Sequence, residues 1–253
     1  MNINLKGKLA VVTGGSGQLG RAICRTLAGC GADVVVHYHS NQHMAEKVCA
    51  ELQEAGVRSI TVQADVTDPA SISTMKTDVE MKLGKPDIIV NNAVIQYNWV
   101  SLLEQDLADY ESQYRSCTLH NVLMAKAFVP AMIEKKWGRV IAINTECAMQ
   151  NLPTQSAYVS GKRGMDGVLR VLAKEIGAYQ ITVNQVAPGW MISEESPDGG
   201  SPGEMEYKEG VPLKRRGCDQ DVANLVAFLA SDLAGFISGQ YISVSGGNVM
   251  PAI

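Results

Sequence analysis

The sequence lacks an apolar run long enough to cross a membrane. A spanning helix needs about 18 or more consecutive apolar residues, and polar residues interrupt every candidate run within a few positions. The first residues lead directly into a strand-like AVVT and a glycine loop, which is not the layout of a secretory signal. We therefore expect a cytoplasmic protein that does not associate with membranes.

Paired cysteines and an excess of basic charge are also absent. The six cysteines include no C-x-x-C pair, so neither a disulfide framework nor a zinc knuckle is predicted. With 22 basic and 26 acidic side chains the net charge is −4, which excludes the basic footprint typical of nucleic-acid binding. Three histidines, His37, His39 and His43, lie near Cys49, but a turn separates the last of them from the strand, so we predict no metal site.

The sequence does contain an alternation of short β-rich apolar runs and longer helical stretches, with no internal repeat or linker. The pattern is typical of α/β proteins with a parallel sheet. We predict a single doubly wound (Rossmann) domain over residues 1–253 with about seven parallel strands. The predicted strands span residues 9–13, 34–38, 60–64, 88–91, 140–144, 181–187 and 241–244. Residues 190–210 are rich in glycine and proline, which favours an irregular, mobile lid over a substrate site.

The first predicted strand ends in a glycine loop, residues 13–20, with the sequence TGGSGQLG. The loop opens directly onto a predicted helix, whose first backbone amides favour a phosphate group. Glycines at such a turn let the backbone approach a pyrophosphate closely. The loop therefore predicts a dinucleotide site.

A second motif pairs Tyr158 with Lys162, one helical turn further on. Residues at this spacing share one face of a helix, and an ammonium beside a phenol favours the phenolate and lowers the tyrosine pKa. The pair therefore predicts that Tyr158 exchanges a proton with a carbonyl or an alcohol.

Taken together, the motifs resemble the short-chain dehydrogenase/reductase family, and in particular its single-domain branch that includes the 3-oxoacyl-carrier-protein reductases. The resemblance extends from Lys6 to Asn248. Its motifs, in chain order, are the glycine loop, Asp65-Val66, Asn91-Asn92-Ala93, the Tyr158 and Lys162 pair, Pro188-Gly189 and Ser245-Gly246-Gly247. The resemblance implies transfer of a hydride between a nicotinamide cofactor and a small carbonyl or alcohol substrate of the ketone or 3-oxoacyl type.

The resemblance also implies a role for individual residues. Tyr158 would be the general acid/base, and Lys162 would hold the nicotinamide ribose and lower the tyrosine pKa. The family's serine that polarises the substrate oxygen falls on Thr145, which keeps a hydroxyl donor. The family's active-site asparagine falls on Cys117, with Asn121 one turn further on as an alternative.

The cofactor contacts that the resemblance implies follow the same motifs. They are Gly14, Ser16, Gln18, Leu19, Gly20, Tyr38, His39, Ser40, Asn41, Asp65, Val66, Asn92, Ala93, Val94, Tyr158, Lys162, Pro188, Gly189, Met191 and Ser193. An acidic residue at the end of the second strand would accept the ribose hydroxyls of NAD, but Tyr38 stands there and no carboxylate follows directly. We therefore predict a preference for NADPH, with Arg21 as a further partner of the 2′-phosphate and NAD as the alternative cofactor.

Four departures from the family pattern, at Gln18, Val94, Cys117 and Thr145, leave a second hypothesis open. The chain could be a dinucleotide-binding protein of the same fold with weak or no catalysis. The glycine spacing also resembles that of sugar-nucleotide epimerases, but the chain is too short for their larger substrate domain. By resemblance we expect a homotetramer that pairs the helices over about 109–134 and 157–177, with Gly161, Gly164 and Gly167 allowing a close approach.

Overall fold

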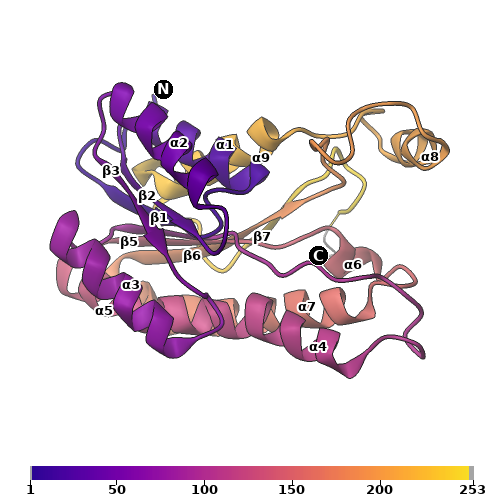
Figure 1. Cartoon of the computed structure of the whole chain (residues 1–253), viewed down its shortest axis with the longest axis horizontal. Coiled ribbons are helices and arrows are strands. Elements are labelled where there is room, and N and C mark those ends of the chain that lie inside the picture. The colour runs from indigo at the N-terminus through magenta and orange to yellow at the C-terminus, as the bar shows by residue number, and fades with distance from the viewer. Residues whose placement is uncertain (1, 251–253) are drawn as a thin grey trace.

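The computed structural model describes residues 2–250 and places a parallel sheet between two layers of helices (Figure 1). The sheet has seven strands in the order β3-β2-β1-β4-β5-β6-β7. The strands are β1 (Leu9–Val12), β2 (Asp33–Tyr38), β3 (Ser59–Gln63), β4 (Ile88–Asn91), β5 (Gly138–Ile143), β6 (Ile181–Pro188) and β7 (Tyr241–Val244). All seven predicted strands are present, each bound lying within two residues of its prediction. The predicted doubly wound α/β fold is confirmed.

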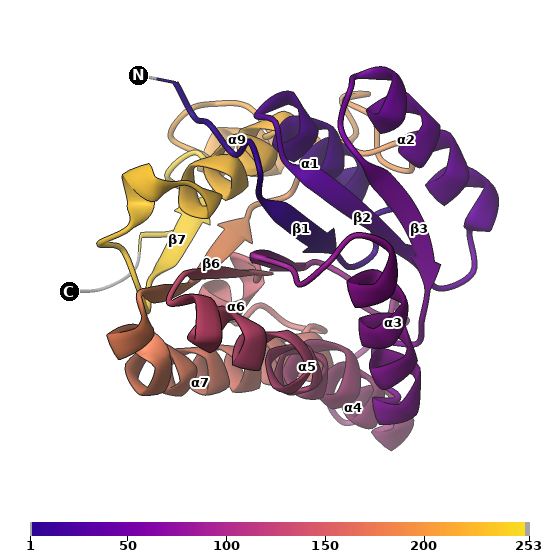
Figure 2. The same cartoon turned by 90° about the vertical axis from the view of Figure 1, so that its left-hand side faces the viewer.

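Alternate side chains of the strands enter two separate cores. On one face Val12 and Val36 pack with α1 (Gln18–Gly29), α2 (Gln42–Glu54) and α9 (Asp219–Ala230). On the other face Val11 and Val35 pack with α3 (Pro69–Lys82), α5 (His120–Lys135) and α7 (Ser156–Ile176). Figures 1 and 2 show these two helical layers on opposite sides of the sheet. Because both faces are covered, the strands read as continuous apolar runs in the sequence.

The order of the strands fixes where a ligand site can form. The chain adds β2 and β3 on one side of β1 and then returns to place β4 on its other side. Such a reversal leaves a crevice at the carboxyl ends of the two central strands, where open α/β sheets bind ligands. The glycine loop that follows β1 and the segment that follows β4 both lie at this edge.

The long helix expected over about 109–134 has a more complex form. It consists of α4 (Leu107–Gln113), a π-helical turn over Tyr114–Leu119, and α5. A π-turn inserts one extra residue into the helix and often marks a functional site. Here it places Cys117 and Thr118 in the interior, against α7.

The stretch 190–210 is irregular only in its first half, which corrects the prediction. Residues Pro202–Gly210 form α8, which stands apart from both helical layers (Figure 1). A capping box starts this helix, because Ser201 accepts a hydrogen bond from the Glu204 amide and Glu204 accepts one from the Ser201 amide. The remaining helical elements are α6 (Cys147–Gln150) and short 3₁₀ turns at Gly177–Tyr179 and Asp232–Ala234.

Candidate active site

Two adjoining cavities open at the carboxyl edge of the sheet. The larger one, which we name the edge cavity, has a volume of about 570 Å³ and extends from the glycine loop to Lys162. The second, which we name the aromatic cavity, has a volume of about 440 Å³, and Tyr97, Trp99, Trp190 and Tyr207 contribute to its walls. Both volumes lie in the range of small-molecule sites.

Most of the predicted cofactor contacts line the edge cavity. These are Gly14, Ser16, Gln18, Leu19, Gly20, His39, Ser40, Asn41, Asp65, Val66, Asn92, Ala93, Val94, Tyr158, Lys162, Pro188 and Gly189, and Thr145 lies beside them. Met191 lines the aromatic cavity instead. Val94, one of the four departures from the pattern that the sequence resembles, forms part of the wall and leaves the cavity open.

The glycine loop is held in shape by close backbone packing. Gly14 has a φ of +63°, in the left-handed region that glycine adopts readily. A Cβ atom on Gly20 would lie 2.1 Å from the carbonyl oxygen of Gly14. The loop therefore folds back on itself so tightly that only glycine fits at position 20. The turn at Gly14 carries no side chain that would cover a ligand.

His37 holds this loop in place. The sequence suggested this histidine only as a metal ligand, and no metal site was predicted. Its Nδ1 accepts a hydrogen bond of 2.9 Å from the Gly14 amide, and its Nε2 lies 3.1 Å from the carbonyl oxygen of Ala64. The ring is therefore neutral, with its proton on Nε2. Burial lowers the pKa of His37 to about 4, which agrees with the neutral form. The histidine ties the ends of β1, β2 and β3 together beneath the cavity.

Tyr38 was predicted to contact the cofactor, but its side chain does not line the edge cavity. Its side chain is 7% exposed and packs in the core with α2, away from the edge cavity. Successive residues of a strand point to opposite faces, so His37 and His39 reach the cavity and Tyr38 does not. The rim at the end of β2 therefore consists of His39, Ser40 and Asn41.

The predicted catalytic residues meet where the two cavities join. Thr145 and Tyr158 line both cavities, while Lys162 lines the edge cavity alone. The Thr145 Oγ1 accepts a hydrogen bond of 3.2 Å from the Cys147 amide, which orients its hydroxyl group. Lys162 is 3% exposed and its Nζ donates to the carbonyl oxygen of Ile143 at 2.6 Å.

The expectation that Lys162 lowers the pKa of Tyr158 is not met. Burial raises the pKa of Tyr158 above its ordinary value, and the thiols of Cys117 and Cys147 add to the rise, with Thr145 partly offsetting it. The Lys162 Nζ lies 5.6 Å from the centre of the tyrosine ring, and burial lowers the pKa of Lys162 itself. Desolvation therefore dominates and favours the neutral phenol over the phenolate.

Cys117 lies close to this pair but lines neither cavity. Its side chain is 1% exposed and its Sγ donates to Gln113 Oε1 at 3.7 Å. Asn121, the alternative, bonds instead to Asn91 at 2.7 Å and to the Cys117 carbonyl oxygen at 2.7 Å. The side chains of Asn121 and Cys117 are therefore both engaged in contacts inside the protein.

Gln18 and Arg21 connect the glycine loop to the lid. The Gln18 amide nitrogen donates to the Ile192 carbonyl oxygen at 3.3 Å, and its Oε1 accepts from the Glu194 amide at 2.6 Å. Arg21 forms an ion pair with Glu194 and does not line the edge cavity. The binding of a phosphate by Arg21 stays a prediction. Ser193, another predicted contact, also lies outside both cavities and accepts from the Ser196 amide.

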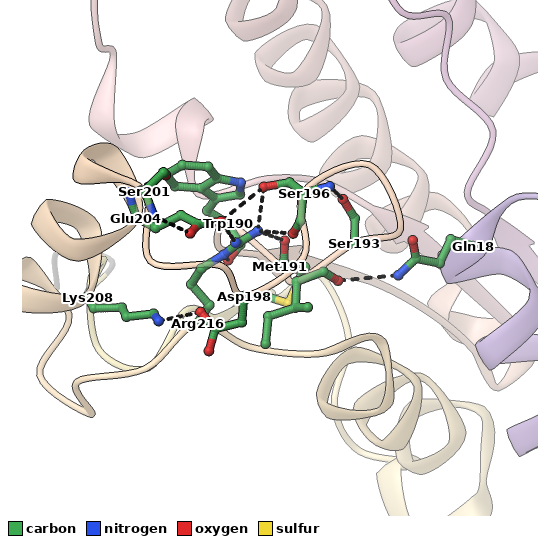
Figure 3. A network of polar contacts seen from close by, with 11 residues as sticks. Gln18, Trp190, Met191, Ser193, Ser196, Asp198, Ser201, Glu204, Lys208 and Arg216 are labelled. Atoms are coloured by element: carbon green, nitrogen blue, oxygen red, sulfur yellow. Dashed lines mark hydrogen bonds and ion pairs between the residues drawn. The ribbon is translucent and has the colours of Figure 1, made fainter.

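A buried ion pair holds the two halves of the lid together (Figure 3). Arg216 is fully buried and donates to Glu204 at 2.6 Å. It also donates to the Ser196 carbonyl oxygen at 3.1 Å, and its guanidinium lies 4.6 Å from the Trp190 ring. These contacts give the irregular segment that begins at Trp190 a fixed position over the aromatic cavity.

Comparisons with known proteins agree with this geometry. The family model described as "Enoyl-(Acyl carrier protein) reductase" matches residues 16–248. The 3-oxoacyl-[acyl-carrier-protein] reductase FabG of Staphylococcus epidermidis is 34% identical, with 96% of this chain and 99% of that protein covered. The Pseudomonas aeruginosa FabG is also 34% identical, with 98% and 100% covered.

The chain belongs to the short-chain dehydrogenase/reductase family.

Solved structures of short-chain dehydrogenases/reductases and similar proteins share the fold. A short-chain dehydrogenase/reductase double mutant from Serratia marcescens superimposes with a TM-score of 0.90 at 31% identity, covering 96% of this chain and 98% of that one. A blue fluorescent protein from a metagenomic library, solved in complex with NADPH, gives 0.91 at 33% identity, covering 98% and 100%. The protein is therefore an NAD(P)-dependent oxidoreductase, as predicted.

The edge cavity fits the nicotinamide dinucleotide that this family uses. The turn at Gly14 and the helix that starts at Gln18 provide the close backbone approach that a pyrophosphate needs, and the absence of a Cβ at Gly20 lets that helix pack against the turn. Over residues 2–250 there is no cluster of three metal-ligating side chains, and no helix there is long and apolar enough to span a membrane.

Proposed function

We propose that the protein reduces a carbonyl group of the ketone or 3-oxoacyl type with NADPH, and that Tyr158 donates the proton. One observation carries this proposal: Thr145 and Tyr158 supply the two hydroxyl groups in the wall common to the edge cavity and the aromatic cavity. A carbonyl group held in the aromatic cavity would face both hydroxyls. The same residues would face a nicotinamide held in the edge cavity.

Each residue has a distinct part in the reduction. When bound, the nicotinamide nucleotide supplies the hydride to the carbonyl carbon. The Thr145 hydroxyl would donate a hydrogen bond to the carbonyl oxygen as negative charge develops on it. Tyr158 would then transfer its phenolic proton to that oxygen, for which its neutral state is the required one. Lys162, fixed by the Ile143 carbonyl oxygen, would hold the ribose.

The preference for NADPH rests on the rim formed by His39, Ser40 and Asn41, which offers hydroxyl, amide and imidazole groups but no carboxylate. A carboxylate there would repel the 2′-phosphate of NADPH. Asn41→Asp tests the preference, because Asn41 caps α2 through its side-chain oxygen and aspartate caps equally well. The affinity for NADPH should fall at least about tenfold relative to that for NADH; an unchanged ratio would contradict the assignment.

The decisive experiment compares Tyr158→Phe, Thr145→Val and Thr145→Ser in NADPH oxidation with a panel of ketones and 3-oxoacyl thioesters. We expect the first two variants to lose turnover by about a hundredfold or more and Thr145→Ser to retain it, because only serine keeps the hydroxyl donor. Binding of NADPH without turnover by the unmodified protein across the panel would favour the alternative function, a dinucleotide-binding protein with little catalysis.

We also propose that residues 1–253 act as one domain in a cytoplasmic homotetramer. Leu107, Tyr114 and Val171 expose large apolar side chains along α4, the π-turn and α7, which supports pairing through these helices. Gly161 and Gly164 do not serve that contact, since they face Gln113 and Thr118 of the same chain. Analytical ultracentrifugation should give four times the chain mass of 27.2 kDa, and a monomer would contradict the proposal.

A further inference from the structure

The aromatic cavity contains one carboxylate, that of Glu146. The residue directly follows Thr145 and precedes α6, and it is 3% exposed. A Cβ atom on Gly189 would lie 3.1 Å from Glu146 Oε2. Because glycine stands there, no side chain at that position covers the carboxylate. Glu146 is therefore both buried and part of the cavity wall.

The hydrogen bonds around Glu146 are arranged for an anion. The Tyr207 hydroxyl accepts a bond of 2.8 Å from the Trp190 amide, so its own proton is directed to Glu146 Oε1 at 2.8 Å. The Asn248 amide nitrogen donates to Oε2 at 3.0 Å. Both oxygens thus receive a donor, and the two bonds leave further lone pairs of the carboxylate for a ligand.

No positive charge balances this carboxylate in the part of the chain that the structure describes. None of the ion pairs among residues 2–250 includes Glu146. Burial raises the pKa of Glu146, while Asn248, Tyr207 and the Trp190 backbone amide oppose the rise. A buried anion without a partner is costly, and a cation entering the cavity would remove that cost.

The walls of the cavity suit a cation as well. Trp99 lies 5.8 Å from the Tyr158 ring and 6.4 Å from the Tyr97 ring, and Trp190 lies 5.5 Å from Tyr207. Aromatic rings attract cations through their faces. The Arg216 guanidinium over Trp190 is an example of this attraction within the lid.

We propose that the substrate of this site carries a positively charged nitrogen near its reacting carbonyl or alcohol group, and that Glu146 pairs with it inside the aromatic cavity. The inference rests on the proposed function, because it takes Thr145 and Tyr158 as the groups that hold the reacting oxygen. It makes Glu146 a specificity-determining residue. An amino ketone or amino alcohol is the substrate class that fits.

Two ketones of nearly equal shape test this proposal. In phenacyltrimethylammonium a quaternary nitrogen carries the positive charge at every pH, and in neopentyl phenyl ketone a carbon atom replaces that nitrogen. With NADPH, we expect kcat/KM for the ammonium ketone to exceed that for the neutral ketone at least tenfold, about 1.4 kcal/mol. In Glu146→Gln this ratio should fall at least tenfold, because the charge is lost while an oxygen acceptor remains. The ammonium group also activates the carbonyl toward hydride, and that part of the ratio is common to both proteins.

Glu206→Gln is the matched control. Glu206 lies on α8, is exposed and lines neither cavity, so its variant loses the same charge and should keep the ratio. An equal or reversed ratio in the unmodified protein overturns the inference whether or not the variants fold. If the ratio is equal or reversed but either ketone is reduced, the proposed function is still supported.

Calorimetry separates the two proposals if neither ketone is reduced. The NADP-loaded protein is then titrated with each ketone. Tighter binding of the ammonium ketone, lost in Glu146→Gln, supports the charge pairing although the proposed reduction has failed for these compounds. Equal binding, or binding of neither ketone, overturns the charge pairing.

Discussion

Replacing Gly20 by alanine should open the glycine loop and remove the nucleotide site. The new Cβ atom would lie 2.1 Å from the Gly14 carbonyl oxygen and 2.9 Å from the Gly15 Cα, both of them backbone atoms that cannot rotate away. Ordinary contact begins near 3.4 Å, so the loop must move by about 1.3 Å. Overpacking of this kind costs about 1–3 kcal/mol, which corresponds to a fall in Tm of about 2–12 °C for a chain of this size.

Gly29→Ala at the end of the same helix is the matched control. A Cβ atom there meets nothing within 4 Å, and alanine stabilises a helix by up to about 1 kcal/mol relative to glycine. We expect this variant to bind NADPH normally and to melt at the same temperature or slightly higher. Gly20→Ala should bind NADPH at least about tenfold more weakly in a fluorescence titration. Normal NADPH affinity in Gly20→Ala would refute the role given to the loop.

Three further predictions concern the proton donor, the buried histidines and the lid. Tyr158→Phe should lower kcat by about a hundredfold or more while the Kd for NADPH is unchanged, and a parallel loss of affinity would assign Tyr158 a structural role instead. Burial lowers the pKa of His37 to about 4 and that of His120 to about 3. The unfolded chain takes up these protons near pH 6.5 and the folded chain does not. The free energy of unfolding should therefore decrease as the pH falls from 6.5 to 4, by about 3 kcal/mol for His37. Urea unfolding at pH 7 and at pH 5 measures this decrease, and equal free energies at the two pH values would contradict it. Arg216→Met leaves the Glu204 carboxylate without its ion-pair partner, which should appear as faster hydrogen exchange in α8. The double variant with Glu204→Gln, which keeps the capping-box acceptor, should recover part of the protection. Unchanged exchange in the single variant would show that the ion pair does not hold the lid.

The sheet could be predicted because its strands are buried on both faces. Such strands appear as short continuous apolar runs, and all seven were found. The glycine loop and the Tyr158 and Lys162 pair are local motifs, and they could be read for the same reason. The side chain of Tyr38 was assigned to the cavity because of its place in the family motif. Side chains of a strand alternate between the two faces of the sheet, and this alternation assigns His37 and His39 to the cavity instead.

Other parts of the site depend on contacts between distant segments. Arg216 and Glu204 are adjacent only in the folded chain, and the pKa of Tyr158 follows from how deeply the structure buries it. The π-turn at Cys117 has no sequence signal that we recognise. The start of α8 did have one, since serine followed three residues later by glutamate is a capping box. The glycines and prolines around it favoured an irregular loop instead.

The central claim is that the edge cavity holds a nicotinamide nucleotide beside a neutral Tyr158. Calorimetric titration of the purified protein with NADPH and with NADH tests it most directly, and the same titrations on Tyr158→Phe separate binding from chemistry. We predict one nucleotide per chain, tighter binding of NADPH than of NADH, and equal affinities in the variant. Failure of the unmodified protein to bind either nucleotide would contradict the account.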